Sequence, residues 1–247
     1  MRSANFIRIE LKRQFCLLRR YPVQAASNAA GLFIISTVAW FGLRAAFFAN
    51  QDYRAVSSVL LWPIVMAALG LVSASLQEDM ALGTIEQLYI ASPSVLPIMH
   101  CRALVYLFFS TAMTFPLWLL GMYYLGGEYL MRWLVYSVGP LLLTVYGLGL
   151  IVGGLTLVYR RTGELVNLVV VGLMALTLVQ VPWSTHWAGM VIHSALPMVD
   201  TSNVANAVYW SEVLLRYGAG GVYFAIGQSL FRRAELKAKQ LGVIGHY

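Results

Sequence analysis

Six long apolar runs constrain this chain more than any other feature of its sequence. Each run is long enough to cross roughly 30 Å of hydrocarbon as an α-helix, and a helix satisfies its own backbone hydrogen bonds in lipid. Of the 247 residues, 60% are hydrophobic and 11% are charged, whereas soluble domains carry roughly 25% charged residues. The sequence therefore predicts an all-α, polytopic membrane protein with spans at about Val23–Phe48, Val56–Leu76, Ala103–Leu125, Leu134–Val158, Leu165–Pro182 and Val213–Phe231.

The positions of the basic residues predict how these spans are oriented. The N-terminal segment, the connections after the second and fourth spans, and the C-terminal tail 232–247 carry thirteen of the seventeen Lys and Arg residues. The positive-inside rule therefore places both termini in the cytoplasm, as expected for a multi-pass protein of the bacterial cytoplasmic membrane. Because the basic residues lie at the ends of apolar runs, we expect the lipid bilayer as their partner and no nucleic acid.

The N-terminal segment 1–22 is predicted to form an amphipathic helix over Asn5–Tyr21, which Pro22 ends. One face holds Ile7, Leu11, Phe15 and Leu18, and another holds Arg8, Lys12 and Arg19. A basic amphipathic helix beside a bilayer normally lies in the interface, with its cations toward anionic lipid. Membrane anchoring and a specific contact with a protein both remain open for this helix.

The connection 77–102 is a polar, acidic insert between two apolar runs. Thr84 and Gln87 have the spacing of a capping box, which predicts a short helix starting after Thr84. Gly83 permits a sharp turn before it, and Glu86 lies in the first turn, where the helix dipole favours an anion. Pro93 then limits its length. We therefore expect a short rigid helix that faces the cytoplasm.

This insert resembles the signature loop of permease subunits of type-2 ABC exporters. The resemblance is carried by Glu78-Asp79, Gly83-Thr84-Ile85-Glu86-Gln87-Leu88 and Ser92-Pro93, and it extends to the six spans, the amphipathic N-terminal helix and a long outer segment. One departure is that Met80 and Ala81 follow Asp79, where the family often has a basic residue.

The resemblance implies a transport subunit that forms a substrate path as a dimer, with a homodimer favoured over a heterodimer. Separate ABC ATPase subunits would carry ATP and Mg, and this chain would need no cofactor of its own. This chain would contact the ATPase through a coupling helix that sits in a cleft of the ATPase subunit. The N-terminal amphipathic helix would touch the same subunit. The residues implied in this coupling are Glu78, Asp79, Gly83, Thr84, Glu86, Gln87, Pro93, Arg8 and Lys12.

The outer segment 183–209 is too short and too interrupted for two further spans. The family has short re-entrant helices at this position, which implies the same role here for Trp187, His193 and Pro197. His186 and His193 have no third ligand at a suitable spacing, so no metal site is predicted. In the fourth span, Gly149-x-x-x-Gly153 followed by Gly154 favours close helix packing.

Two other functional classes remain as alternatives. An autonomous secondary transporter should have ionisable residues near the membrane centre or repeated halves with broken helices. A membrane-embedded enzyme should have clustered His, Asp or Glu, whereas the four histidines of this chain are scattered. The sequence contains no phosphate-binding Gly-x-x-x-x-Gly-Lys motif, so ATP hydrolysis by that means would require another chain. The transported substrate stays open.

Overall fold

The computed structural model describes residues 2–20, 53–91, 94–125, 138–159, 163–178 and 210–241, together with eight isolated positions between Pro22 and Thr37. Within these residues every regular element is a helix, which confirms the predicted all-α class. The helices are α1 (Arg2–Arg20), α3 (Tyr53–Ala81), α4 (Ile85–Ala91), α5 (Leu96–Leu125), α7 (Gly139–Tyr159), α8 (Gly163–Leu178) and α10 (Trp210–Gln240).

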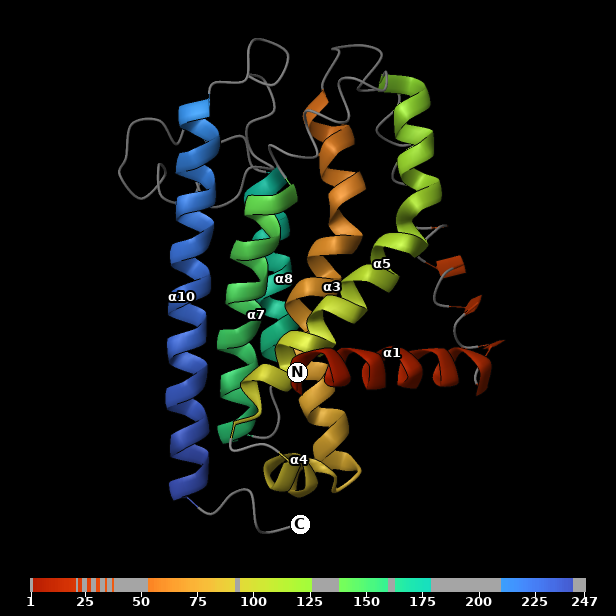
Figure 1. Ribbon diagram of the computed structural model, residues 1–247. Coiled ribbons are helices and arrows are strands. Elements are labelled where there is room, and N and C mark those ends of the chain that lie inside the picture. Colours follow the sequence, from red (N-terminus) through yellow and green to blue (C-terminus); the bar gives the residue numbers. More distant parts are fainter. Residues whose placement is uncertain are drawn as a thin grey trace.

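Helix α7 lies between α3 and α10 and packs against both (Figure 1). Glycines allow both contacts. A methyl group at Gly149 would come 2.9 Å from the Ala68 carbonyl oxygen of α3, and one at Gly153 would overlap Val72. The predicted close packing at these two glycines is confirmed. Small residues of this kind let helix backbones approach in membranes, where apolar burial alone does not drive association.

The contact between α7 and α10 is equally close. A methyl group at Gly147 would come 2.6 Å from the Tyr223 carbonyl oxygen, and one at Gly227 would overlap the backbone of Gly147. We call the two contacts of α7, with α3 and with α10, the glycine seam. It continues into a hydrophobic core to which α3, α4, α5, α7 and α10 all contribute; the largest fully buried members include Leu76, Ile85, Met99, Leu150, Leu157 and Phe231.

Helix α1 lies across the bundle and not along it (Figure 1). It packs on α5, where Phe15 meets Phe109 edge to face with ring centroids 5.4 Å apart. The helix spans Arg2–Arg20, whereas Asn5–Tyr21 was predicted. Pro22 and Val23 are themselves helical, so the predicted stop at Pro22 is wrong. At the other end of the chain, α10 continues to Gln240, so residues 232–240 of the predicted C-terminal tail belong to the last helix.

Of the six predicted spans, one meets the length and composition of a membrane helix within the described residues. This helix is α7, and 67% of its apolar window is buried inside the bundle. Helix α5 contains a shorter apolar stretch, Leu96–Ala112. Buried core helices of soluble proteins share this length and composition.

Candidate functional site

Helices α3 and α4 meet in a tight turn that determines where the polar insert begins. Gly83 adopts a left-handed conformation with φ of 66°. The Gly83 amide donates to the Met80 carbonyl at 3.1 Å, and the Thr84 amide donates to the Asp79 carbonyl at 2.9 Å. This pair of bonds is a Schellman motif with glycine at its left-handed position. The sharp turn predicted at Gly83 is confirmed.

Thr84 therefore ends one helix and starts the next. Helix α4 begins at Ile85, and Leu88 donates to the Thr84 carbonyl at 3.2 Å, so the predicted start of the short helix is confirmed. The predicted capping box is wrong, because the Thr84 amide that Gln87 would satisfy is bound to Asp79. The Thr84 hydroxyl also donates to Asp79, to its carbonyl at 3.3 Å and its Oδ1 at 3.4 Å.

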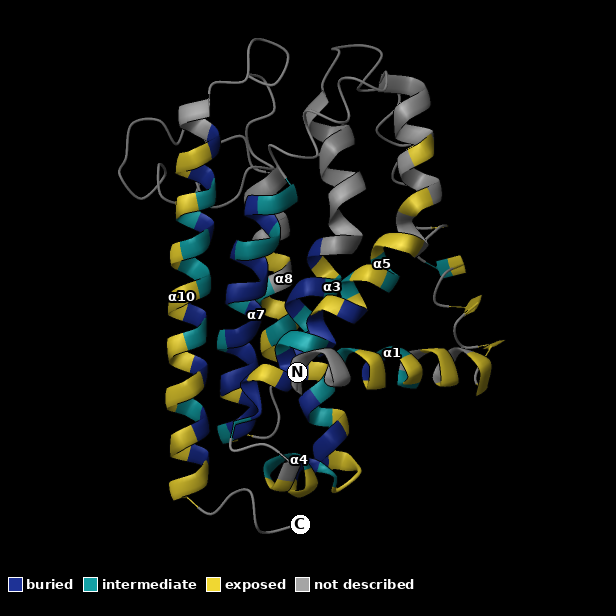
Figure 2. Ribbon diagram, viewed as in Figure 1, coloured by how far each residue is buried: buried dark blue, intermediate teal, exposed yellow. Residues whose placement is uncertain are grey.

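Helix α4 has an inner and an outer side. Ile85 is buried at 1% exposure, and Leu88 and Tyr89 pack against the core with it. The outer side carries Glu86, Gln87 and Ile90, all exposed, and the side chain of Ile90 is 86% exposed. Leu82, in the turn before α4, is exposed as well. A seven-residue helix at the end of the bundle thus presents an acidic, amide and apolar surface (Figure 2).

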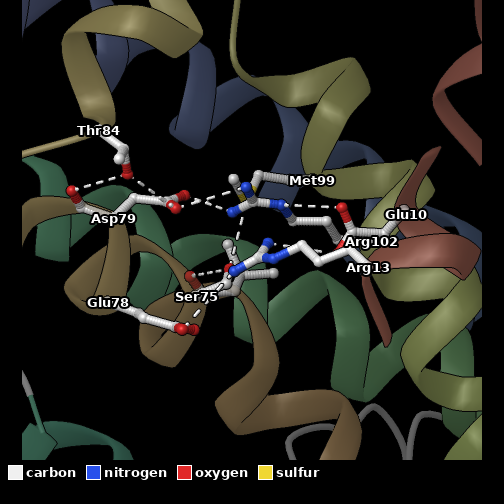
Figure 3. Close-up of polar contacts among 9 residues, drawn as sticks. Glu10, Arg13, Ser75, Glu78, Asp79, Thr84, Met99 and Arg102 are labelled. Atoms are coloured by element: carbon white, nitrogen blue, oxygen red, sulfur yellow. Dashed lines mark hydrogen bonds and ion pairs between the residues drawn. The ribbon is translucent and has the colours of Figure 1, made fainter. Parts of the chain in front are cut away.

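The inner end of the Schellman turn rests on a buried ion pair. Asp79 is 3% exposed and Arg102, from α5, is 8% exposed. Arg102 Nη1 donates to Asp79 Oδ2, and Nη2 donates to Oδ1 at 3.4 Å, a two-pronged contact (Figure 3). Removing two charges from water is costly, and a guanidinium that bonds both carboxylate oxygens offsets much of that cost. Asp79 therefore faces inward and positions α4.

The N-terminal helix joins this pair from the opposite side. Glu10 of α1 is buried, and its Oε2 lies 3.7 Å from Arg102 Nε, while its Oε1 lies 3.3 Å from Arg13 Nη1. Arg13 Nη2 in turn lies 3.6 Å from Glu78 Oε1, next to Asp79 in the chain. We call these five residues the charge cluster (Figure 3). It links α1, the end of α3 and the start of α5.

The start of α5 is also held by α7 and α10. His100 Nδ1 lies 2.8 Å from Tyr146 Oη, and its ring packs against Tyr146 and Phe224 with centroids 5.8 Å away from each. Burial, and then the positive charge of Arg232, lower the pKa of His100 below its ordinary value. Both effects favour the neutral imidazole.

The predicted coupling residues occupy different environments in the structure: some are exposed, and others are part of the turn behind α4. Glu86 and Gln87 are exposed on α4, and Arg8 and Lys12 are exposed on α1. Glu78 is exposed but paired, whereas Asp79, Gly83 and Thr84 build the turn behind α4. Pro93 and the predicted outer residues Trp187, His193 and Pro197 lie outside the described residues.

Sequence reasoning missed the residues that hold α4 in place. Arg102 and Arg13 were counted as topology signals, and Glu10 and Glu235 were given no role. A signal existed for Glu235, because it falls on the spacing of three and four residues that the buried side of α10 follows: Val213, Arg216, Gly220, Gly227, Phe231, Glu235 and Ala238. Arg102 and Arg13 are the cations that pair with Asp79 and Glu78.

Comparison with protein-family models, with curated proteins and with solved structures gives no significant match for this chain. The function must therefore be argued from the site. Across the described part of the chain, no group of three or more His, Cys, Asp or Glu side chains is placed to hold a metal ion.

Proposed function

We propose that this chain is the transmembrane permease subunit of an ATP-driven exporter. Helix α4 would be the contact with a separate ATPase subunit, and two copies of the chain would form the substrate path. The observation that carries the proposal is the construction of α4. Its inner side is anchored by Ile85 and the Asp79 turn, while Glu86, Gln87 and Ile90 face outward at the end of an apolar bundle.

A short helix anchored in this way suits the transfer of force. The Schellman turn leaves little freedom between α3 and α4, and the bonds from Thr84 to Asp79 add a side-chain tie. Burial of Asp79 against Arg102 resists tilting, because any separation would leave a charge without its partner in a dry site. A push on α4 would therefore move the ends of α3 and α5 with it.

The apolar surface of the bundle supports a membrane location. Large apolar side chains remain exposed at intervals along single helix faces: Leu104, Phe108, Phe115 and Leu119 on α5, and Leu215, Val222, Ile226 and Leu230 on α10 (Figure 2). Soluble monomers rarely expose contiguous apolar patches of this kind. We propose that lipid and a second copy of the chain cover these faces in the six-span protein, with both termini in the cytoplasm.

Helix α1 would lie at the cytoplasmic membrane surface beside α4. Its exposed basic residues Arg8, Lys12 and Arg19 are spaced by four and seven residues, so they share one side of the helix. These cations suit either anionic lipid headgroups or the ATPase. Because Glu10 and Arg13 tie α1 to Arg102 and Glu78, α1 would follow any movement of α4.

The test is purification of the tagged chain from its own membranes, followed by identification of the bound proteins. We expect an ABC ATPase subunit to co-purify with the wild-type chain, and the chain alone to hydrolyse no ATP. Glu86→Lys should reduce the co-purified ATPase about tenfold or more, since reversing an interfacial charge brings like charges together and costs several kcal/mol. Quantitative mass spectrometry of the eluted complex gives the ratio.

The matched control is Glu164→Lys, an identical charge change at an exposed residue in the first turn of α8. It should leave the amount of co-purified ATPase unchanged. Equal ATPase recovery from the wild type and from Glu86→Lys would exclude α4 as the docking helix. Absence of any ATPase from the wild-type preparation would argue for a secondary transporter instead.

A further inference from the structure

Glu235 is a buried carboxylate on the cytoplasmic part of α10, and the proposed function does not yet use it. Its exposure is 3%, and it lies between the fully buried Phe231 and Ala238 on the inner side of the helix. Glu is almost never fully buried unless it is paired. The partners that Glu235 finds therefore indicate what the position is for.

Those partners belong to the start of α5. The Ser94 hydroxyl donates to Glu235 Oε2 at 2.9 Å, and the Val95 amide donates to Oε1 at 3.0 Å. The Met99 amide donates to the Val95 carbonyl, so Val95 is the N-cap residue directly before α5, and the Leu96 amide donates to Ser94 Oγ at 3.3 Å. The first amides of a helix lack intrahelical partners and attract negative charge. A carboxylate from α10 thus caps α5.

The same carboxylate reaches α4 through Lys239. Lys239 Nζ lies 3.4 Å from Glu235 Oε1 and 4.7 Å from the centroid of the Tyr89 ring, an arrangement that combines an ion pair with a cation–π contact. Tyr89 is on the inner side of α4. Burial, and then the negative charge of Glu235, raise the pKa of Tyr89, so its phenol stays protonated and neutral against the core.

On the N-terminal side of Glu235, α10 packs closely against α7. A methyl group at Gly154 of α7 would come 3.2 Å from Ala234 Cβ, next to Glu235. The close contact of Gly227 with Gly147 lies two turns from there, toward the N-terminus of α10. Interfaces packed this closely do not deform continuously but transmit strain. A continuous path of contacts therefore runs from α4 through Lys239 and Glu235 into the glycine seam.

We propose that Glu235 is a positioning residue that joins α4 and the start of α5 to α10, so that the three move as one unit. The inference rests on the proposed function, because it describes how a push on α4 reaches the membrane helices. The charge cluster ties α4 to α1 and α5, and Glu235 adds the connection to the last helix. Without Glu235, α4 would still bind the ATPase, but its movement would no longer reach α10.

The first experiment uses the full chain in lipid nanodiscs and compares Glu235→Ala with Arg233→Ala, a change at an exposed residue of the same helix. Hydrogen exchange should rise about tenfold at residues 85–99 in Glu235→Ala and stay at the wild-type level in Arg233→Ala, since loss of a buried tie lowers the cost of local opening. Exchange in α7 should not change. Equal exchange in the two variants overturns the inference, and so does a rise spread over the whole bundle.

The second experiment uses the complex with the co-purified ATPase. A spin label is attached at Leu236→Cys, an exposed position of α10, after Cys16 and Cys101 are replaced by Ser. Addition of ATP and vanadate should change the spectrum of this complex, and Glu235→Ala should reduce that change by about half or more while ATPase recovery is unaffected. Glu235→Gln keeps an acceptor for the Val95 amide but loses the charge that pairs with Lys239, so its response should fall between those of the wild type and Glu235→Ala.

The outcomes separate this inference from the proposed function. A wild-type complex whose label responds equally with and without Glu235 overturns the inference alone. Failure of any ATPase to co-purify overturns the proposed function and the transmitting role together, while the exchange experiment still decides whether Glu235 holds α4. A loss of response in Arg233→Ala equal to that in Glu235→Ala would also contradict a role specific to Glu235.

Discussion

The charge cluster and the glycine seam hold the same bundle together by opposite means. In the charge cluster, three carboxylates and two guanidinium groups from α1, α3 and α5 meet at one end of the bundle. In the seam, α7 approaches α3 and α10 so closely that a single methyl group at several glycines would meet backbone. The charge cluster depends on which charged groups pair with one another, and the glycine seam depends on the small volume of its residues.

This difference indicates how each region responds to change. A buried charge whose partner is lost has no acceptable alternative, so the cluster should fail sharply at single residues. Close packing responds differently, because an added atom displaces one helix from the other and weakens the contacts of several neighbouring residues. In the proposed exporter, one end of the bundle would receive a push and the remainder would have to move as one body, and this combination of the two regions suits that task.

The largest effect should come from breaking the buried pair. Asp79→Ala leaves Arg102 buried beside only the more distant Glu10, and we expect a loss of about 3–5 kcal/mol in unfolding free energy. The neighbouring Glu78→Ala removes an exposed pair and should cost about 1 kcal/mol or less. Unfolding of the purified chain in mixed detergent micelles measures both.

A double variant tests whether pairing or shape matters at this position. Asp79→Leu combined with Arg102→Met replaces both charges by apolar groups, and it should be clearly more stable than Asp79→Ala alone. If the double variant is the less stable of the two, the cluster contributes net stability beyond the avoidance of an unpaired charge.

The next effect should come from adding one methyl group to the seam. Gly227→Ala would place a carbon on the backbone of Gly147, and overpacking of this kind costs about 1–3 kcal/mol. The control is Gly221→Ala on the same helix, where a methyl group meets nothing within 4 Å. That substitution should stabilise the helix by up to about 1 kcal/mol. Opposite signs for the two variants in the same unfolding assay would confirm the seam, and equal signs would contradict it.

The smallest effect concerns His100, which lies where the two regions meet. Because its pKa is lowered in the folded chain, the unfolded chain binds the proton more readily, and stability should fall as the pH drops below the unfolded value of about 6.5. His100→Gln should remove that part of the loss. Melting temperatures of both proteins between pH 7.5 and 5.5 give the difference, and parallel curves would show that His100 does not contribute.

Local patterns allowed part of this architecture to be predicted. Gly83 marked the turn, Thr84 marked the start of α4, and the Gly149-x-x-x-Gly153 spacing marked the seam. Each of these depends on residues within one turn or one helix. The capping box failed for a specific reason: the turn that ends α3 had already used the Thr84 amide. Competition between two local motifs for one donor is decided by geometry.

The sequence by itself determined that the chain is helical and apolar, and which short segment is polar and rigid. Only the tertiary structure decided that Asp79 faces inward while Glu86 faces outward. It also decided that Glu10, Arg102 and Glu235 position α4 and the start of α5. The physical reason is range. Helix and turn preferences act over a few residues, whereas a buried charge is satisfied by whichever distant segment the packed helices bring to it, and its position along the chain does not reveal that partner.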